Sequence, residues 1–231
     1  MTSTDEWRLS RAPADCSSSI PPPGPFPDEP PAIVMPESHD PRAWMRRHLF
    51  ERRVVLMSGT LDDGTANEVG ASLMTLDAMG DDPVYLQMDS GEGTTGAALT
   101  LMDIIDLCGV PVLGTGIGYV AGPVVGVFAV CSHRTLSPNA RVRLFEPPVE
   151  VAGNAAQLQH LAQTHVDRWA GFCSRVSAAS GQPEDRVHRD AASGRYFSAQ
   201  EAIDYGLADE VATPDAPMRR LPSRPIGFGP R

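Results

Sequence analysis

Short apolar runs alternate along the chain with stretches in which apolar residues recur every three or four positions. The runs at 54–57, 84–88 and 112–116 predict buried strands. The stretches 64–79 and 94–107 have helical spacing. Strands that alternate with helices favour a parallel sheet with right-handed crossovers, so the pattern predicts an α/β fold.

The second half of the core continues this alternation. It predicts an apolar helix at 123–131, a strand at 141–145 and a long helix at 154–179 that ends at Ser180 and Gly181. Ser198 and Glu201 have the spacing of a capping box and predict one more helix, followed by a strand at 207–211.

Two glycine-rich segments, 89–93 and 118–122, each follow a predicted strand and precede a predicted helix. We expect both to be turns. Such a turn exposes backbone N–H groups at a helix N-terminus, which suit an oxyanion or a carbonyl oxygen. Glycines that only permit tight turns would give the same pattern.

Composition divides the chain into three parts. Residues 1–40 are rich in proline, serine and acidic residues, which predicts a disordered or extended arm, with a propeptide as an alternative. Residues 41–213 have the patterning of one globular domain. Residues 214–231 are rich in proline and arginine and predict a mobile tail.

The charge excludes some classes of partner. The chain has 231 residues and a formal net charge of −10, with no lysine, so a nucleic acid or an anionic membrane is a poor partner. No apolar stretch is long enough to span a membrane, and the N-terminus does not resemble a secretory signal. The four cysteines are too far apart for a zinc motif or a disulfide framework: Cys16, Cys108, Cys131 and Cys173. We therefore expect a cytoplasmic protein without a metal or cofactor.

Several stretches of the core form a series: residues 50–59, 60–67, 85–93, 137–141, 181–183 and 196–211. In their order and approximate spacing they resemble the proteolytic subunit of the Clp protease (the ClpP family, within the crotonase-like superfold). The resemblance covers about 41–213 and implies an α/β spiral of ββα units with a handle helix. The 1–40 arm is unlike that family.

A working member of the family is a serine peptidase that uses Ser, His and Asp in that chain order. Alignment on Gly118 places Gly122 at the position of the serine, whereas alignment on 138–140 without a gap places Val120 there. We prefer Gly122, because a deletion fits better in the later turn near 132–133. The histidine position falls on Phe145 and the aspartate position on Gly194. The resemblance therefore implies a scaffold from which nucleophile, base and orienting group are all lost, although it leaves open whether the chain is an enzyme.

Two alternative interpretations retain catalytic activity. A rewired hydrolase would have to use other groups, of which the available ones are Ser90, Ser132, His133, His160 and His165. We expect 132–133 to be a surface turn, and His160 and His165 are not stacked on one helix face.

The other alternative is a crotonase-like acyl-CoA enzyme, because 118–122 is similar to the thioester-binding turn of such proteins. An oxyanion-like turn would involve Gly93 and Pro123, but Pro123 has no N–H to donate.

The resemblance also implies partners. Family members form seven-membered rings, stacked in pairs through a handle that matches about 149–179, and they dock an ATPase on an apolar pocket. The matching pocket positions are Tyr85, Gln87 and Leu107, and Gln87 replaces a usual aromatic residue, which predicts weakened docking. A charged inter-ring stretch is replaced by 192–194, so a single ring or a smaller assembly is also compatible. We expect a homo-oligomer, or a mixed particle with an active paralogue, that modulates Clp proteolysis or sensitivity to Clp-directed compounds.

Overall fold

The computed structural model describes residues 41–213. The predicted arm at 1–40 and the predicted tail at 214–231 lie outside the described residues. In chain order the elements are α1 (Pro41–Phe50), β1 (Val54–Leu61), α2 (Asp63–Ala78), β2 (Val84–Gly93), α3 (Thr95–Leu107), β3 (Val112–Ala121), α4 (Pro123–Ala129), β4 (His133–Leu136), β5 (Arg141–Arg143), α5 (Ala155–Ser180), α6 (Glu184–Ala192), β6 (Tyr196–Ser198), α7 (Ala199–Tyr205) and β7 (Glu210–Val211).

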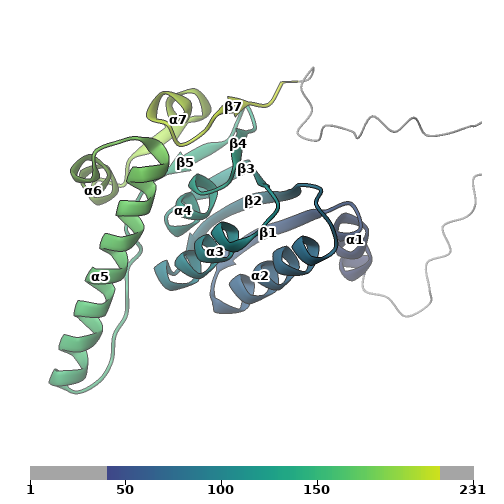
Figure 1. Cartoon of the computed structure of the whole chain (residues 1–231). Coiled ribbons are helices and arrows are strands. Elements are labelled where there is room, and N and C mark those ends of the chain that lie inside the picture. The colour runs from purple at the N-terminus through teal and green to yellow at the C-terminus, as the bar shows by residue number, and fades with distance from the viewer. Residues whose placement is uncertain (1–40, 214–231) are drawn as a thin grey trace, which may run out of the picture. The chain divides into compact units, whose positions relative to one another are not determined.

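The strands form one sheet in the order β1-β2-β3-β4-β7, and β5 pairs with both β3 and β6. Every pairing is parallel except that of β5 with β6. The α/β expectation is confirmed, and Figure 1 shows the helices layered against the sheet. Because the parallel strands share a direction, the carboxyl ends of β1, β2 and β3 lie along one edge, where ligands bind in open α/β sheets.

The core lies between the sheet and the helices that follow its strands. Along β2 the alternate residues Val84, Leu86 and Met88 are fully buried, whereas Tyr85 and Gln87 between them are only half-buried. Successive side chains of a strand point to opposite faces, so the two sets belong to different sides of the sheet. The fully buried set therefore faces the helices.

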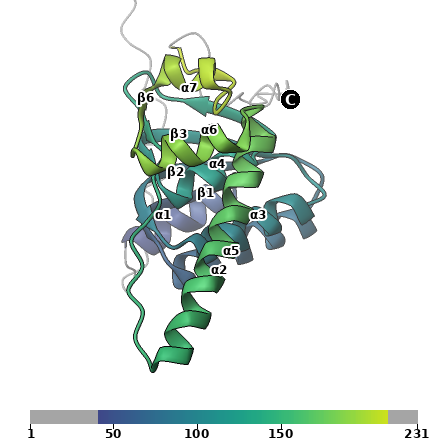
Figure 2. The same cartoon turned by 90° about the vertical axis from the view of Figure 1, so that its left-hand side faces the viewer.

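Helix α5 is partly outside this core. Asn154 caps its N-terminus in a capping box, and Gly181 ends it in a left-handed conformation at φ 69°. Its buried residues are confined to the C-terminal half: Trp169, Phe172, Cys173, Val176 and Ser180. The N-terminal half extends away from the sheet in two perpendicular views (Figures 1 and 2). On this half, Leu161 and Val166 are 40% and 57% exposed.

Of the two predicted glycine-rich turns, 89–93 and 118–121 belong to strands instead, and Gly122 forms a turn. β2 continues to Gly93, where it pairs with Leu61, and β3 continues to Ala121, where it pairs with Arg143. A register shift between Met88 and Ser90 bends β2 within the first segment. Pairing with distant strands overrides the local preference of these glycines for turns.

Other differences lie in short elements. His133 begins β4, so the expected surface turn at 132–133 is wrong at that residue. Strand β5 ends at Arg143, which leaves Phe145 in an irregular segment, and β7 has only two residues. Sequence reasoning did not predict α1, β4, α6 or β6. Within 41–213, no helix is long and apolar enough to cross a membrane.

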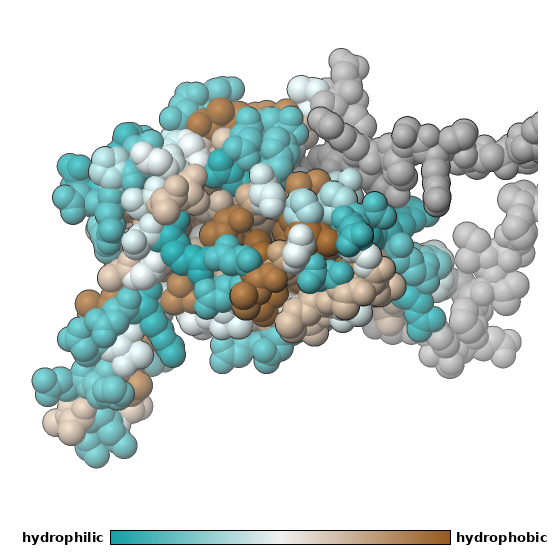
Figure 3. Space-filling view, in the orientation of Figure 1, coloured by the Kyte–Doolittle hydropathy of each residue, from teal (hydrophilic) through white to brown (hydrophobic). Residues whose placement is uncertain are grey.

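Large apolar side chains also reach the surface. Figure 3 shows apolar patches over the helix layer, whereas the projecting end of α5 is mostly hydrophilic. Met74, Met79 and Leu107, at or near the ends of α2 and α3, are 54%, 66% and 83% exposed. Contiguous apolar patches on a surface are typical of protein interfaces.

Candidate functional site

A cleft of about 940 Å³ opens at the carboxyl ends of β1, β2 and β3. We call it the Phe145 cleft. Its walls come from the ends of β1 and β2, from β3 and β5, and from the irregular segment after β5; they include Thr60, Asp89, Gly93, Tyr119, Arg143 and Phe145. A volume of this size suits a small molecule or a short peptide segment.

Gly122 forms the turn from β3 into α4 beside this cleft. Its backbone has φ 55° and ψ −127°, a conformation that side-chain-bearing residues rarely adopt. A Cβ on Gly122 would lie 2.9 Å from Cε1 and Cζ of Phe145. The backbone N–H of Gly122 donates a 2.8 Å hydrogen bond to the carbonyl oxygen of Arg143. The ring of Phe145 therefore occupies the space into which a side chain at 122 would project.

Val120 has a different environment. It lies within β3 with its side chain fully buried. A Cβ on Gly116 would come 2.9 Å from Cγ2 of Val120, so this side chain packs inside the domain. The fold brings Gly122 against Phe145 and leaves Val120 in the core.

Arg143 links Phe145 to Gly194. Its guanidinium carbon lies 4.7 Å from the ring centre of Phe145 and 4.8 Å from that of Tyr196, within cation–π range. Its Nε donates a 3.4 Å hydrogen bond to the carbonyl oxygen of Gly194. A Cβ on Gly194, which has φ 64°, would lie 3.1 Å from Nη2 of Arg143. Phe145 and Gly194 are thus joined by a cation held between two aromatic rings.

Tyr119 completes this group from β3. Burial, followed by a hydrogen bond with Tyr196, raises the pKa of the Tyr119 phenol, while the nearby Arg143 opposes the shift. The phenol of Tyr119 therefore stays protonated well above neutral pH. The backbone N–H of Tyr119 donates a 3.0 Å hydrogen bond to Oδ1 of Asp89. Sequence reasoning missed both Tyr119 and Arg143; the signal for Arg143 was its place two residues before Phe145, on the same side of an extended segment.

The expected oxyanion-like positions differ in the structure. Gly93 lines the Phe145 cleft, and a Cβ there would come 2.7 Å from both Cβ and the carbonyl oxygen of Leu61. Strand β1 therefore lies too close to Gly93 for a residue with a side chain at that position. Pro123 is buried at the start of α4 and supplies no N–H.

The available serines and histidines are not paired with each other. Oγ of Ser90, which is 3% exposed, donates to the carbonyl oxygen of Gly59. Nε2 of His165 lies 2.9 Å from Oε1 of Glu146. His133 contacts carboxylates of Asp209 and Glu210, while Ser132 and His160 are exposed. Within the part of the chain that the structure describes, neither Ser90 nor Ser132 is hydrogen-bonded to a histidine ring, and no cluster of His, Cys, Asp or Glu is arranged to hold a metal.

The cysteines do not provide a nucleophile either. Burial raises the pKa of Cys131 and of Cys173 to about 12, and burial also raises that of Cys108. A thiolate is therefore disfavoured at these three positions near neutral pH. Cys16 lies outside the described residues.

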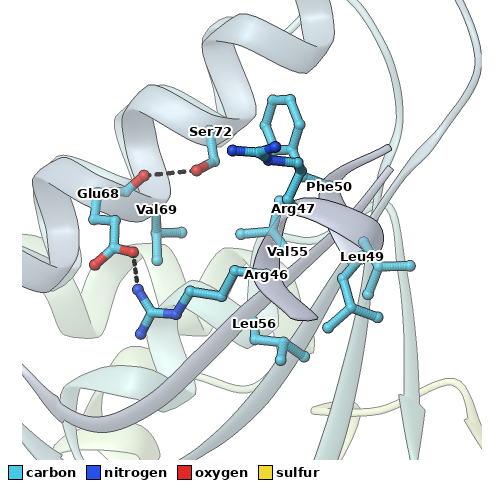
Figure 4. A pocket seen from close by; sticks show the side chains of 10 residues that line it. Arg46, Arg47, Leu49, Phe50, Val55, Leu56, Glu68, Val69 and Ser72 are labelled. Carbon is cyan, nitrogen blue, oxygen red and sulfur yellow. Dashed lines mark hydrogen bonds and ion pairs between the residues drawn. The ribbon is translucent and has the colours of Figure 1, made fainter. Parts of the chain in front are cut away.

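A smaller pocket of about 240 Å³ lies between α1, β1 and α2 (Figure 4). An ion pair of Arg46 with Glu68 crosses its mouth, and Leu56 is one of its apolar walls. Leu56 pairs with Gln87 across β1 and β2, so this pocket borders one expected ATPase-docking position. Tyr85 shares the half-buried face of β2, whereas Leu107 ends α3 in the helix layer. None of the three expected docking residues lines this pocket, and their role stays a prediction.

A comparison with known proteins identifies the family to which this chain belongs. The profile described as Clp protease matches residues 39–215. This chain belongs to the Clp protease family.

Individual relatives agree with the family assignment. The chain is 29% identical to ATP-dependent Clp protease proteolytic subunit 2 of Thermobifida fusca, over 72% of this chain and 84% of that protein. It is 30% identical to subunit 1 of Leifsonia xyli, over 71% and 84% of the two chains. It is also 26% identical to the proteolytic subunit of Streptococcus thermophilus, over 79% and 96%. The matches therefore cover between 84% and 96% of the length of these Clp relatives.

Proposed function

We propose that this chain is a non-catalytic subunit of the Clp protease family. In this proposal it assembles with itself or with an active paralogue, and it modulates Clp proteolysis or the sensitivity of the particle to Clp-directed compounds. The observation that carries the proposal is the contact between Gly122 and Phe145, with Arg143 between Phe145 and Gly194.

Three groups must cooperate in a serine peptidase: a hydroxyl that attacks, an imidazole that takes its proton and a carboxylate that orients the imidazole. The assigned positions bear a hydrogen atom, a phenyl ring and a hydrogen atom. The cation of Arg143 is held beside Gly194, where the resemblance would place a carboxylate. Because the Phe145 ring contacts the space at Gly122, a single reversion would not restore the original arrangement.

The two alternatives have less support. A rewired hydrolase needs a nucleophile next to a base, yet Ser90 donates to a backbone carbonyl and His165 contacts a carboxylate. A crotonase-like enzyme needs free N–H groups at the turn into α4. The N–H of Gly122 already donates to the carbonyl oxygen of Arg143, and Pro123 has no backbone N–H.

Assembly is supported by the surface. The N-terminal half of α5 projects from the domain and exposes Leu161 and Val166. Met74, Met79 and Leu107, at or near the ends of α2 and α3, expose further apolar area. A contact with a second subunit would cover such side chains at a gain of about 25 cal/mol for each Å² removed from water. The family resemblance supports another Clp subunit as the partner, and a cytoplasmic location.

Regulation through an ATPase is the less supported part of the proposal. Gln87 brings an amide to a position where the family has an aromatic anchor. An amide contributes less apolar contact than a ring, so docking on this subunit is expected to be weak. In a mixed particle, each copy of this chain would then lower the number of ATPase-docking sites and the number of active sites.

The direct test is co-expression of this chain with an active Clp proteolytic subunit from the same organism, each bearing a different tag. After sequential affinity steps, native mass spectrometry gives the composition of the particles. The expected result is mixed particles whose peptidase activity scales with the number of active subunits.

Two controls make the result decisive. The chain purified alone should not hydrolyse peptides, and an active subunit whose serine is replaced by alanine should assemble in the same way. Strictly separate particles would contradict the mixed assembly, whereas peptidase activity of this chain alone would contradict its non-catalytic role.

A further inference from the structure

The irregular segment 146–153 connects β5 to α5 and forms part of the wall of two pockets. We call this segment the strap. It runs alongside the projecting half of α5 to reach the N-terminus of that helix (Figures 1 and 2). Pro147 and Pro148 line the Phe145 cleft. Residues 147–151 also line a pocket of about 420 Å³ that takes further residues from α3 and α5, which we call the α5 pocket. A movement of the strap would therefore change the width of both pockets.

The backbone of the strap makes no hydrogen bond within the described residues. Just before it, the N–H of Leu144 donates to the carbonyl oxygen of Arg195 at 2.9 Å. Just after it, the N–H of Asn154 donates to Oε1 of Gln157 at 2.9 Å. A segment whose backbone is hydrogen-bonded only beyond its two ends has low local stability. The position of the strap therefore depends on its side chains.

Two side chains attach the strap between its ends. Pro147 is buried, and Oε1 of Glu146 lies 2.9 Å from Nε2 of His165 on α5. The His165 side chain is 24% exposed and that of Glu146 is 43% exposed, so water screens this pair only in part. Within 41–213, this pair is the polar link that joins the strap to the projecting half of α5.

A histidine makes the strength of this link depend on pH. An imidazole changes its charge between about pH 5 and 8, a range in which carboxylates are ionised. At the acidic end of the range the pair consists of a cation and an anion, whereas at the basic end it is a hydrogen bond to a neutral ring. Charge-assisted hydrogen bonds are the stronger kind. The link between Glu146 and His165 therefore weakens as the pH rises through this range.

Other charged groups around His165 favour its cation on balance. Asp63 at the start of α2 and Glu150 of the strap line the α5 pocket together with His165, and both favour the imidazolium. Arg168 of α5 lines the same pocket and opposes it. Two carboxylates are thus set against one guanidinium.

The remaining elements that pack on α5 are α3, α4 and α6. The carboxylates of Asp103 and Asp106 on α3 are both paired with Arg175, and α4 has no charged residue. On α6, the charge of Glu184 acts together with that of Glu146 to raise the pKa of Cys173. None of these groups opposes a positive charge on His165.

From this arrangement we propose that segment 146–153 is a proton-controlled strap. When His165 is protonated, Glu146 tethers the strap to α5, and the Phe145 cleft and the α5 pocket are both narrow. When His165 is neutral, the tether weakens, the strap moves away from α5, and both pockets widen. This device does not depend on whether the chain cleaves peptides or assembles with a paralogue.

The test is limited proteolysis of the full chain by a glutamate-specific protease at pH 6 and at pH 8. Cleavage after Glu150, identified by mass spectrometry, reports release of the strap. A synthetic peptide with the sequence of 146–154 corrects for the pH dependence of the protease. The corrected rate should be at least about twofold higher at pH 8 than at pH 6, in keeping with the modest strength of a partly exposed pair.

Two variants remove the titrating pair but keep a side chain that can form a hydrogen bond. His165→Gln and Glu146→Gln should each give the same corrected rate at both pH values. The matched control is His48→Gln, because His48 lies 3.1 Å from Glu51 in another His–Glu pair, at α1. This variant should keep the full pH dependence.

Three results would overturn the strap. The first is an equal corrected rate at pH 6 and pH 8 in the natural chain. The second is a pH dependence that survives in His165→Gln. The third is the absence of cleavage after Glu150 at either pH, which would show that another surface covers the segment. Melting temperatures of the variants equal to that of the natural chain would exclude global unfolding as the cause of cleavage.

Discussion

The ring of Phe145 lies against Gly122, with Cε1 and Cζ both 2.9 Å from the place of a Cβ on that glycine. The two residues are 23 positions apart, and they meet because β3 and β5 pair side by side, with Ala121 opposite Arg143. The Phe145 ring fits here only because residue 122 has no side chain. Glycine also adopts the φ of 55° at this position without the strain that other residues would have.

Gly122→Ser should therefore destabilise the chain and give no peptidase activity. The new side chain would meet the Phe145 ring and would hold a strained backbone, at a cost of about 1–3 kcal/mol. Chemical denaturation measures the loss. The matched control is Gly171→Ser, since Gly171 lies in α5 with no atom within 4 Å of its Cβ position, and this variant should be unchanged or slightly more stable.

Phe145→Ala provides the second half of a double-mutant cycle. In the Phe145→Ala background, Gly122→Ser should cost less than in the natural chain, because the ring that it meets is gone. Equal costs in the two backgrounds would show that the contact between the two residues does not limit what position 122 can hold.

Arg143→Leu should cost about 1–2 kcal/mol of folding free energy, because it removes two cation–π contacts of about 0.5–1 kcal/mol each. It should also raise the pKa of Tyr119 further, since Arg143 opposes the existing upward shift. Chemical denaturation and an ultraviolet pH titration measure these effects. Arg141→Leu, at an exposed residue of the same strand, should leave the Tyr119 titration unchanged.

Asp209 gives a pH-dependent contribution to stability. Its carboxylate accepts hydrogen bonds from the backbone N–H and the guanidinium of Arg134, which hold its pKa below the ordinary 3.8. Since the folded-state pKa is the lower one, the stabilisation is present above 3.8 and is lost as the pH falls through the folded-state value. Asp209→Asn should cost about 1.5–3 kcal/mol at neutral pH.

The pH dependence of the unfolding free energy tests whether the Arg134–Asp209 pair is the source of this stabilisation. The difference in unfolding free energy between the natural chain and Asp209→Asn should narrow as the pH falls below about 4. Asp81→Asn, at an exposed turn, should follow the natural chain throughout. A difference that stays constant down to acid pH would exclude the Arg134 pair as its source.

Val166→Asp should separate folding from assembly. Val166 is 57% exposed on the projecting half of α5, so the substitution should leave the melting temperature of the domain nearly unchanged. It should disrupt subunit association, because a charge at a covered apolar contact has to be desolvated. Light scattering after gel filtration gives the mass, and Ala178→Asp, exposed near the other end of the helix, is the control. An assembly mass that survives Val166→Asp would show that this half of α5 is not an interface.

The sequence predicts the layered α/β order well, because strands such as β2 and helices such as α2 have strong periodicity and caps. Asp62 and Ser198 cap α2 and α7 as their residue types indicate. The glycine-rich ends of β2 and β3 were mistaken for turns, because their pairing partners are distant in sequence. Helix α6, which starts after Pro183, lies between the resembling stretches 181–183 and 196–211 and was not predicted.

The site could be predicted only in part. Motif alignment picked out Gly122, Phe145 and Gly194, but it could not place them in contact. The cation between Phe145 and Tyr196 depends on where β5 and β6 pair, with Arg143 opposite Tyr196.

The most direct measurement of the non-catalytic proposal is activity-based labelling of the purified chain, produced in a host from which its own Clp proteolytic subunit has been deleted. The chain is treated with a fluorophosphonate probe and, in parallel, with a fluorogenic oligopeptide, beside an active Clp subunit as the positive control. We predict no covalent adduct by intact-mass spectrometry and no peptide hydrolysis. A stoichiometric adduct on any serine of residues 41–213, together with turnover of the peptide, would contradict the account.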